Sequence, residues 1–201
     1  MDGQKQKGGI DMEKIVVTQE MMQRQDGKRV GGYSKHWLYL TNLRAYREGV
    51  LLGVYLHFPF DEKDLEAAYK TIYVGNEFID ENGESYEEYF ITDYDAPFSI
   101  GEYDFPQRLA EKYDELRDYM SYPEEVVQYI ADCDGKEVNI IHLGGSENLS
   151  KYEKVGHSLV ALGYYEVPRS LLSYIDYEKL GKDFLINSSG DVVGDYFIEI
   201  N

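Results

Sequence analysis

The sequence predicts an α+β protein, and two observations predict it. The 201 residues are 43% hydrophobic and 14% aromatic, which is enough apolar material to bury a core. Strand-like segments dominate the first half of the chain, helical segments dominate the middle, and both kinds return near the C-terminus. The length fits one domain, or two or three small domains in a row.

The N-terminal segment, residues 1–32, is polar and glycine-bearing. Only residues 14–18 have the β-branched content of a strand, so we expect a flexible extension outside the core. The sequences HWLYLTNL and VLLGVYLHF then predict two strands, separated by a loop, RAYREG, that Gly49 closes.

A short helix and a third strand complete the predicted N-terminal sheet domain, residues 33–103. In residues 61–73 apolar side chains recur at helical spacing, and Asp61 is a natural N-cap. Asn82-Gly83 is a strong turn signal. Residues 86–94 alternate well enough to form a strand whose acidic side chains face outward.

Two amphipathic helices are predicted in a helical middle domain, residues 104–135. In residues 105–120 one face is apolar, while Glu111, Glu115 and Asp118 lie on another face at spacings of four and three residues. A second, shorter helix follows, with acidic residues in its first turn where they suit the helix dipole.

The C-terminal domain, residues 136–201, is predicted to be α+β. The expected elements are a strand at 138–143, a helix at 149–162 ended by Gly163, shorter helices at 168–175 and 176–182, and a hairpin whose arms, 184–187 and 192–200, flank a turn at 188–191.

The charge of the chain is large, negative and uneven. With 38 Asp and Glu against 20 Lys and Arg, the formal net charge is −18 at pH 7. Residues 1–48 carry nine basic and six acidic residues, net +3, whereas residues 49–201 carry eleven and thirty-two, net −21. Such a field repels nucleic acid and attracts basic surfaces, including those that normally bind DNA. We therefore expect a protein partner and no direct nucleic-acid ligand.

The acids are densest in residues 77–118, where fourteen accompany only three bases. Most acidic surfaces merely keep proteins soluble, so charge alone leaves open a solvated surface or an imitation of DNA. Since duplex DNA carries about one charge per 1.7 Å, a net charge of −21 matches about 36 Å, roughly one helical turn. The candidate partner-binding acids, here called the acidic band, are Glu77, Asp80, Glu81, Glu84, Glu87, Glu88, Asp93, Asp95, Glu102, Asp104, Glu111, Asp114, Glu115, Asp118, Glu124 and Glu125.

Cysteine usage and hydropathy predict a cytoplasmic protein. The single cysteine, Cys133, cannot form an internal disulfide, which is typical of a reducing compartment. The longest apolar stretch, residues 50–56, is far shorter than the roughly 20 residues of a membrane span, so no membrane partner is expected. The N-terminus, MDGQKQKGG, lacks the apolar core of a signal peptide.

No constellation of residues predicts an enzyme, a metal site or a cofactor. His57, His142 and His157 are far apart in the sequence and lack the spacing of zinc ligands. No local catalytic signature surrounds Cys133 or His142. A small hydrolase with one buried carboxylate pair stays open, because spacing in the sequence does not reveal burial.

Several segments in series resemble the ArdA antirestriction family. In chain order they are Thr41-Asn42-Leu43 with Tyr46-Arg47-Glu48-Gly49 and Gly53-Val54-Tyr55; YEEYFITDYD at 86–95 with Pro97-Phe98 and Glu102-Tyr103; and Val167-Pro168 with Leu171, Tyr174-Ile175-Asp176-Tyr177 and Gly181-Lys182-Asp183. The likeness covers residues 37–201, and both order and spacing agree with the family.

This resemblance implies an elongated, dimeric, non-catalytic protein of three small domains in series, typical of mobile genetic elements. Its carboxylates would imitate bent B-form DNA and block the DNA-binding slot of a type I restriction-modification enzyme, at the methyltransferase core. The less acidic C-terminal domain suggests a dimer interface at Leu162, Tyr164, Tyr165 and Val167. The alternative is an acidic adaptor or decoy that binds another basic DNA-handling or defence protein.

Overall fold

The computed structural model describes residues 13–145 and 148–201, in which helices are combined with three small sheets. The predicted α+β class is therefore confirmed. The chain separates into two compact units, with the boundary between Asp114 and Glu115. The division into three domains in series stays a prediction.

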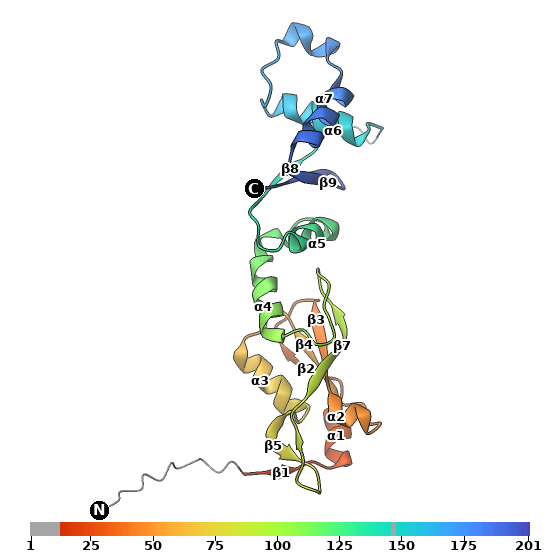
Figure 1. Ribbon diagram of the computed structural model, residues 1–201, viewed down its shortest axis with the longest axis vertical. Coiled ribbons are helices and arrows are strands. Elements are labelled where there is room, and N and C mark those ends of the chain that lie inside the picture. The colour runs from red at the N-terminus through yellow and green to blue at the C-terminus, as the bar shows by residue number, and fades with distance from the viewer. Residues whose placement is uncertain (1–12, 146–147) are drawn as a thin grey trace, which may run out of the picture. The chain divides into compact units, whose positions relative to one another are not determined.

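Unit 1 is built on a four-stranded sheet in the order β2-β4-β3-β7 (Figure 1). Its strands are β2 (Lys28–Gly31), β3 (Trp37–Asn42), β4 (Gly53–His57) and β7 (Tyr89–Asp95). β3 pairs antiparallel with both β4 and β7, and β2 pairs parallel with β4. The two predicted strands, now β3 and β4, are confirmed. Their predicted loop contains a helix, α2 (Leu43–Arg47), because the Asn42 side chain caps it by accepting from the Ala45 amide.

Helix α3 (Glu62–Thr71) packs against β2 and β4 and covers one face of this sheet (Figure 1). The predicted N-cap is confirmed: Asp61 accepts from the amides of Lys63 and Asp64, and Asp64 completes a capping box. The core of unit 1 combines the buried side chains of α3 with the inward side chains of the strands, which are Leu65, Ala68, Leu38, Leu40, Val54 and Leu56.

A second, three-stranded sheet joins β1 (Ile15–Val16), β5 (Gly75–Ile79) and β6 (Ser85–Tyr86). The predicted strand over residues 86–94 is confirmed as β7, but its start is wrong: Tyr86 belongs to β6, which pairs with β5, whereas β7 pairs with β3. Alternation along the chain is a local signal that does not identify the partner strand. β5 was not predicted, because its opening residues, Gly75 and Asn76, are poor strand formers.

Residues 13–32 are part of unit 1, which corrects the expectation of a flexible extension for this segment. β1 pairs parallel with β5, β2 pairs parallel with β4, and helix α1 (Gln19–Gln25) lies between them with Thr18 as its cap. Val17 and Met22 are 5% and 2% exposed. The segment is polar on average, but these two apolar side chains are buried because β1 and β2, which flank them, pair with β5 and β4, strands distant in the sequence. Residues 1–12, the rest of the predicted extension, lie outside the described residues.

Helices follow in the predicted middle region. They are α4 (Pro106–Glu115), which ends at the boundary between the units, the 3-10 helix η1 (Arg117–Tyr119) and α5 (Glu124–Asp132). The helix expected over residues 105–120 is confirmed as α4, but its continuation to residue 120 is wrong, because the backbone leaves the α-helix at Leu116 and tightens into η1. Asp118 therefore does not share a continuous helical face with Glu111 and Glu115. The second predicted helix, α5, is confirmed, with Val126 and Ile130 buried.

The C-terminal sheet of unit 2 has the antiparallel order β8-β10-β9. Its strands are β8 (Val138–His142), β9 (Gly190–Val193) and β10 (Tyr196–Ile200), and its helical elements are α6 (Lys151–Ala161), η2 (Arg169–Tyr174) and α7 (Tyr177–Asn187). The predicted hairpin is misplaced: residues 184–187 continue α7, and the turn lies at Gly194-Asp195. The short apolar run Phe184-Leu185 fits a buried strand or a helix equally well, so periodicity could not decide.

Helices α6 and α7 approach each other closely at two glycines. A Cβ atom on Gly156 would lie 2.0 Å from the Tyr177 carbonyl oxygen, and one on Gly181 would lie 2.0 Å from that of Tyr152. The His157 ring stacks on Tyr177 with 3.7 Å between centroids. This pair of helices packs on the sheet around a core of Leu143, Val155, Leu159 and Phe197.

Candidate partner-binding surface

The acidic band lies at the surface of both units. Fourteen of its sixteen residues are exposed, and the other two, Glu77 and Asp80, are partly buried. In unit 1 the band includes residues of β5, the β5–β6 turn, β7 and α4; in unit 2 it includes Glu115 and residues of η1 and α5. Because none of these carboxylates is buried, each unit offers its part of the band to a partner.

The Asp80 carboxylate stabilises the β5–β6 turn. Its Oδ1 accepts from the amides of Asn82 and Glu84, each at 2.8 Å, and its Oδ2 lies 2.5 Å from Nη2 of Arg44. The Glu84 amide and the Arg44 guanidinium lower the pKa of the Asp80 carboxyl below its ordinary value. Arg44 also pairs with Glu84 at 3.2 Å and Glu48 at 3.0 Å. One arginine therefore neutralises part of the band.

Other carboxylates of the band hold nearby groups of the chain. Glu88 pairs with Arg47 at 3.5 Å, and Glu87 accepts from the Ser85 hydroxyl at 2.5 Å. Asp104 accepts from the Gly101 amide at 2.7 Å, as Asp93 does from the amide of Tyr94 at 2.9 Å. These bonds order the loops around the band but leave each carboxylate with unused acceptor capacity.

A further group of carboxylates makes no hydrogen bond or ion pair within residues 13–145 and 148–201. This group, here called the unpaired acids, consists of Glu81, Asp95, Glu102, Glu111, Glu115, Asp118 and Glu125. The bases on α4 are held instead by aromatic rings: Arg108 lies 5.7 Å from the Phe105 centroid and Lys112 lies 5.2 Å from that of Phe98. The unpaired acids thus lie exposed, and the bases of α4 do not pair with them.

The negative charge is shared evenly between the two units. Residues 1–114 contain 22 acidic and 13 basic residues, and residues 115–201 contain 16 and 7, so each unit carries a net charge of −9. Each unit therefore attracts basic surfaces by itself.

The comparison with known families agrees with this surface. A family model described as antirestriction protein (ArdA) matches residues 38–199. The chain belongs to the ArdA family. The match spans both units, as the resemblance of residues 37–201 indicated. A comparison with curated proteins found no match to the chain.

The residues expected at an ArdA-type dimer interface are exposed or partly exposed apolar side chains of unit 2. Leu162, Tyr164 and Tyr165 are 58%, 48% and 43% exposed, and Val167 is partly exposed. Sequence reasoning missed other exposed apolar side chains of this unit, which are Leu171, Tyr174 and Ile186. Apolar side chains in short helices are usually buried, so the local sequence does not indicate that these three are exposed.

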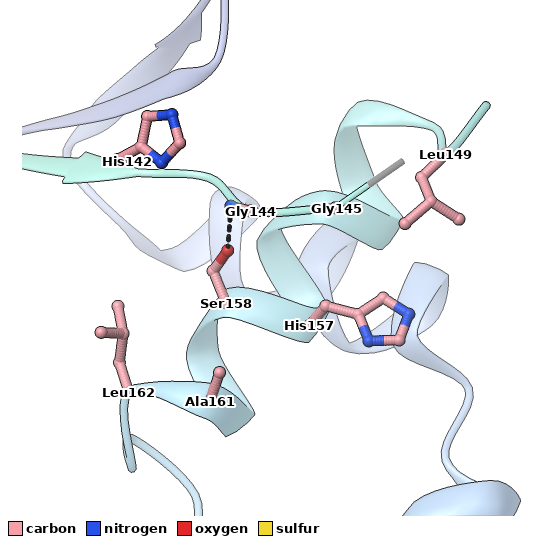
Figure 2. A pocket seen from close by; sticks show the side chains of 8 residues that line it. All are labelled: His142, Gly144, Gly145, Leu149, His157, Ser158, Ala161 and Leu162. Carbon is pink, nitrogen blue, oxygen red and sulfur yellow. Dashed lines mark hydrogen bonds between the residues drawn. The ribbon is translucent and has the colours of Figure 1, made fainter. Parts of the chain in front are cut away.

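A pocket of about 510 Å³ opens in unit 2 of this ArdA-family chain, lined by residues of β8 and α6 and by the loop between them. Figure 2 shows His142 and His157 on either side of a hydrogen bond in which the Gly144 amide donates to the Ser158 hydroxyl at 3.3 Å. The Ser158 hydroxyl thus bonds to backbone rather than to an imidazole. This is not the serine–histidine geometry of a nucleophile with its base.

The remaining candidates for chemistry have structural surroundings. Cys133 is buried, and desolvation raises the pKa of its thiol, which disfavours the reactive thiolate. Within the described residues, no group of three or more His, Cys, Asp or Glu side chains is placed to hold a metal ion. No helix in the described part of the chain is long and apolar enough to cross a membrane.

Proposed function

We propose that this ArdA-family chain is a non-catalytic antirestriction protein whose acidic band mimics B-form DNA. In this role it occupies the DNA-binding slot of a type I restriction-modification enzyme at the methyltransferase core. The set of exposed, unpaired acids carries the proposal, since neighbouring bases are held by the chain's own aromatic rings. A surface built to bind phosphates offers lysine and arginine side chains to such carboxylates.

The charge density supports imitation of a duplex. A net charge of −9 on each unit equals the charge on about 15 Å of double-stranded DNA. On α4, Glu111 and Glu115 are four residues apart, which is about 6 Å along the helix axis and of the order of phosphate spacings.

We also propose that two copies associate through Leu162, Tyr164, Tyr165 and Val167. These side chains expose an apolar surface that a second copy would cover. Two anions associate best through surfaces of low charge, and a symmetric pair would double the length of the imitated duplex. The two copies would then contact the enzyme simultaneously and bind it more tightly than one copy does.

Competition against DNA tests the function. A fluorescently labelled duplex is bound to a type I methyltransferase core, and the full chain is added over a series of salt concentrations. We expect the chain to displace the duplex, and displacement to weaken as salt rises, because both ligands bind through charge. Binding to the core without displacement of the duplex would instead support the acidic adaptor.

Single neutralisations test whether the surface is distributed. Glu81→Gln, Asp95→Asn and Glu111→Gln should each weaken displacement by at most about fivefold, because exposed charge contacts are worth about 1 kcal/mol or less. Asp183→Asn on α7, an exposed acid outside the band, is the matched control and should change little. Complete loss of inhibition by one folded variant would contradict the distributed surface and favour a catalytic carboxylate.

A further inference from the structure

Aromatic rings cover the face of the four-stranded sheet opposite α3. Trp37 and Tyr39 of β3 and Tyr55 and His57 of β4 alternate with the buried core side chains, so they lie on the outer face. Ring centroids are 5.0 Å apart for Trp37 and Tyr55, 4.6 Å for Tyr39 and Tyr55, and 6.5 Å for Tyr55 and His57. These four residues, here called the aromatic face, are partly exposed.

Hydrogen bonds and close packing hold the aromatic face in position. The Tyr39 hydroxyl donates to Asp26 at 2.8 Å, and the ring covers Gly53, where a Cβ atom would lie 2.2 Å from Cε1 of Tyr39. Nδ1 of His57 lies 3.0 Å from the Ser34 carbonyl oxygen, which can only accept, so this nitrogen donates. A surface ordered in advance loses little conformational entropy on binding.

Two exposed carboxylates border the aromatic face along β7. The strand register places Asp93 opposite Tyr39 and Asp95 opposite Trp37, so these carboxylates and rings lie on the same face of the sheet. On the other side, Arg29 of β2 is in register with Tyr55; it is exposed and donates to the Gly32 carbonyl oxygen at 2.8 Å, a neutral group that leaves its positive charge in place. The negative charge beside the rings is therefore on the β7 side, at Asp93 and Asp95.

We propose that the aromatic face, together with Asp93 and Asp95, binds arginine side chains of a basic protein segment. The rings would stack on the planar guanidinium, and a carboxylate would accept its paired N–H groups. Lysine offers no plane to stack and no fork, and phosphate-bearing ligands are repelled by the carboxylates. This inference rests on the proposed function, in which the arginines belong to the DNA-binding surface of the restriction-modification enzyme.

Trp37 is the only tryptophan of the chain, so its emission reports directly on the aromatic face. The full chain is titrated with an oligoarginine peptide and with an oligolysine peptide of the same length. We expect the oligoarginine peptide to bind about fivefold more tightly and to change the Trp37 emission, because stacking adds to a shared charge attraction. Equal affinities, or an unchanged Trp37 emission, would overturn the inference.

Variants separate stacking from overall charge. Tyr55→Leu and Asp95→Asn should each reduce the preference for the oligoarginine peptide, and Asp95→Asn does so without changing a core side chain. Tyr103→Leu, which removes a 70% exposed tyrosine of the same unit outside the aromatic face, should leave the preference intact. Trp37 emission that changes with protein concentration in the absence of peptide would mean that a second copy covers this face, and would contradict the proposal.

The duplex competition assay distinguishes this inference from the proposed function. If the unmodified chain displaces the duplex and Tyr55→Leu does so equally well, the inference is wrong while the decoy function stands. If the chain prefers oligoarginine but fails to displace the duplex, the arginine site stands and the decoy function is wrong.

Discussion

Replacing Met22 by alanine should destabilise unit 1 substantially. Met22 lies on α1 and is 2% exposed, in a segment whose polar composition indicated a flexible extension. Truncating a buried methionine to alanine costs about 2–5 kcal/mol. For a chain of this size about 1 kcal/mol shifts the melting temperature by roughly 2–4 °C, so the expected decrease is about 4–20 °C.

Thermal unfolding followed by Trp37 fluorescence is the assay, because this tryptophan lies on β3 and reports on unit 1 alone. Gln23→Ala, an exposed position of the same helix, is the control and should stay within about 0.5 kcal/mol. If Met22→Ala lowers the melting temperature no more than Gln23→Ala, then α1 does not contribute to the core and residues 13–32 are separable from it.

Three other predictions follow from buried polar contacts, titration and exposed apolar surface. Asn42→Ala should destabilise the chain by about 1–3 kcal/mol in denaturant unfolding, since it leaves the buried Ala45 amide without its cap acceptor and the Ile72 carbonyl oxygen without its donor. Asn42→Asp should not restore stability, because it keeps the cap acceptor but loses the buried donor. Folding lowers the pKa of Asp80, so the ionised carboxylate stabilises the folded chain at pH values above the ordinary aspartate pKa. This stabilisation is lost as the pH falls through the lower pKa of the folded state. The melting temperature of Asp80→Asn should therefore decline less steeply in acid than that of the unmodified chain. Sedimentation should show a dimer at low micromolar concentration that Tyr164→Ser with Tyr165→Ser converts to a monomer with weaker inhibition, and a dimer that survives this change would place the interface elsewhere.

Elements whose signals are local could be predicted from the sequence. α3 begins after Asp61 as expected, because a capping aspartate and an apolar stripe act within a few residues of each other. The partners of β1 and β2 could not be predicted, because both pair in parallel with strands distant in sequence, β5 and β4. Pairing of this kind is decided by tertiary packing rather than by local composition.

The same limit applies to the candidate site. The structure places the acidic band at the surface, but spacing in the sequence could not separate Asp80 from its neighbour Glu81. Asp80 orders a turn and pairs with Arg44, whereas Glu81 makes no polar contact within the described residues. The distinction depends on a partner 36 positions away, which no local pattern reveals.

The basic residues near the N-terminus bear on how much of the acidic band is available to a partner. Arg44 and Arg47 belong to the segment of residues 1–48 with net charge +3, and they pair with Asp80, Glu84 and Glu88 of the band. The net charge of the chain therefore overstates how strongly the β5–β6 turn attracts a basic partner, because ion pairs within the chain neutralise part of the negative charge there. The unpaired acids from β7 onward have no such compensation, so a basic partner gains most from contacting β7, α4 and α5. β7 also carries Asp93 and Asp95, the carboxylates that border the aromatic face. In the proposed arginine site, this one strand would both attract a basic partner and accept hydrogen bonds from its guanidinium groups.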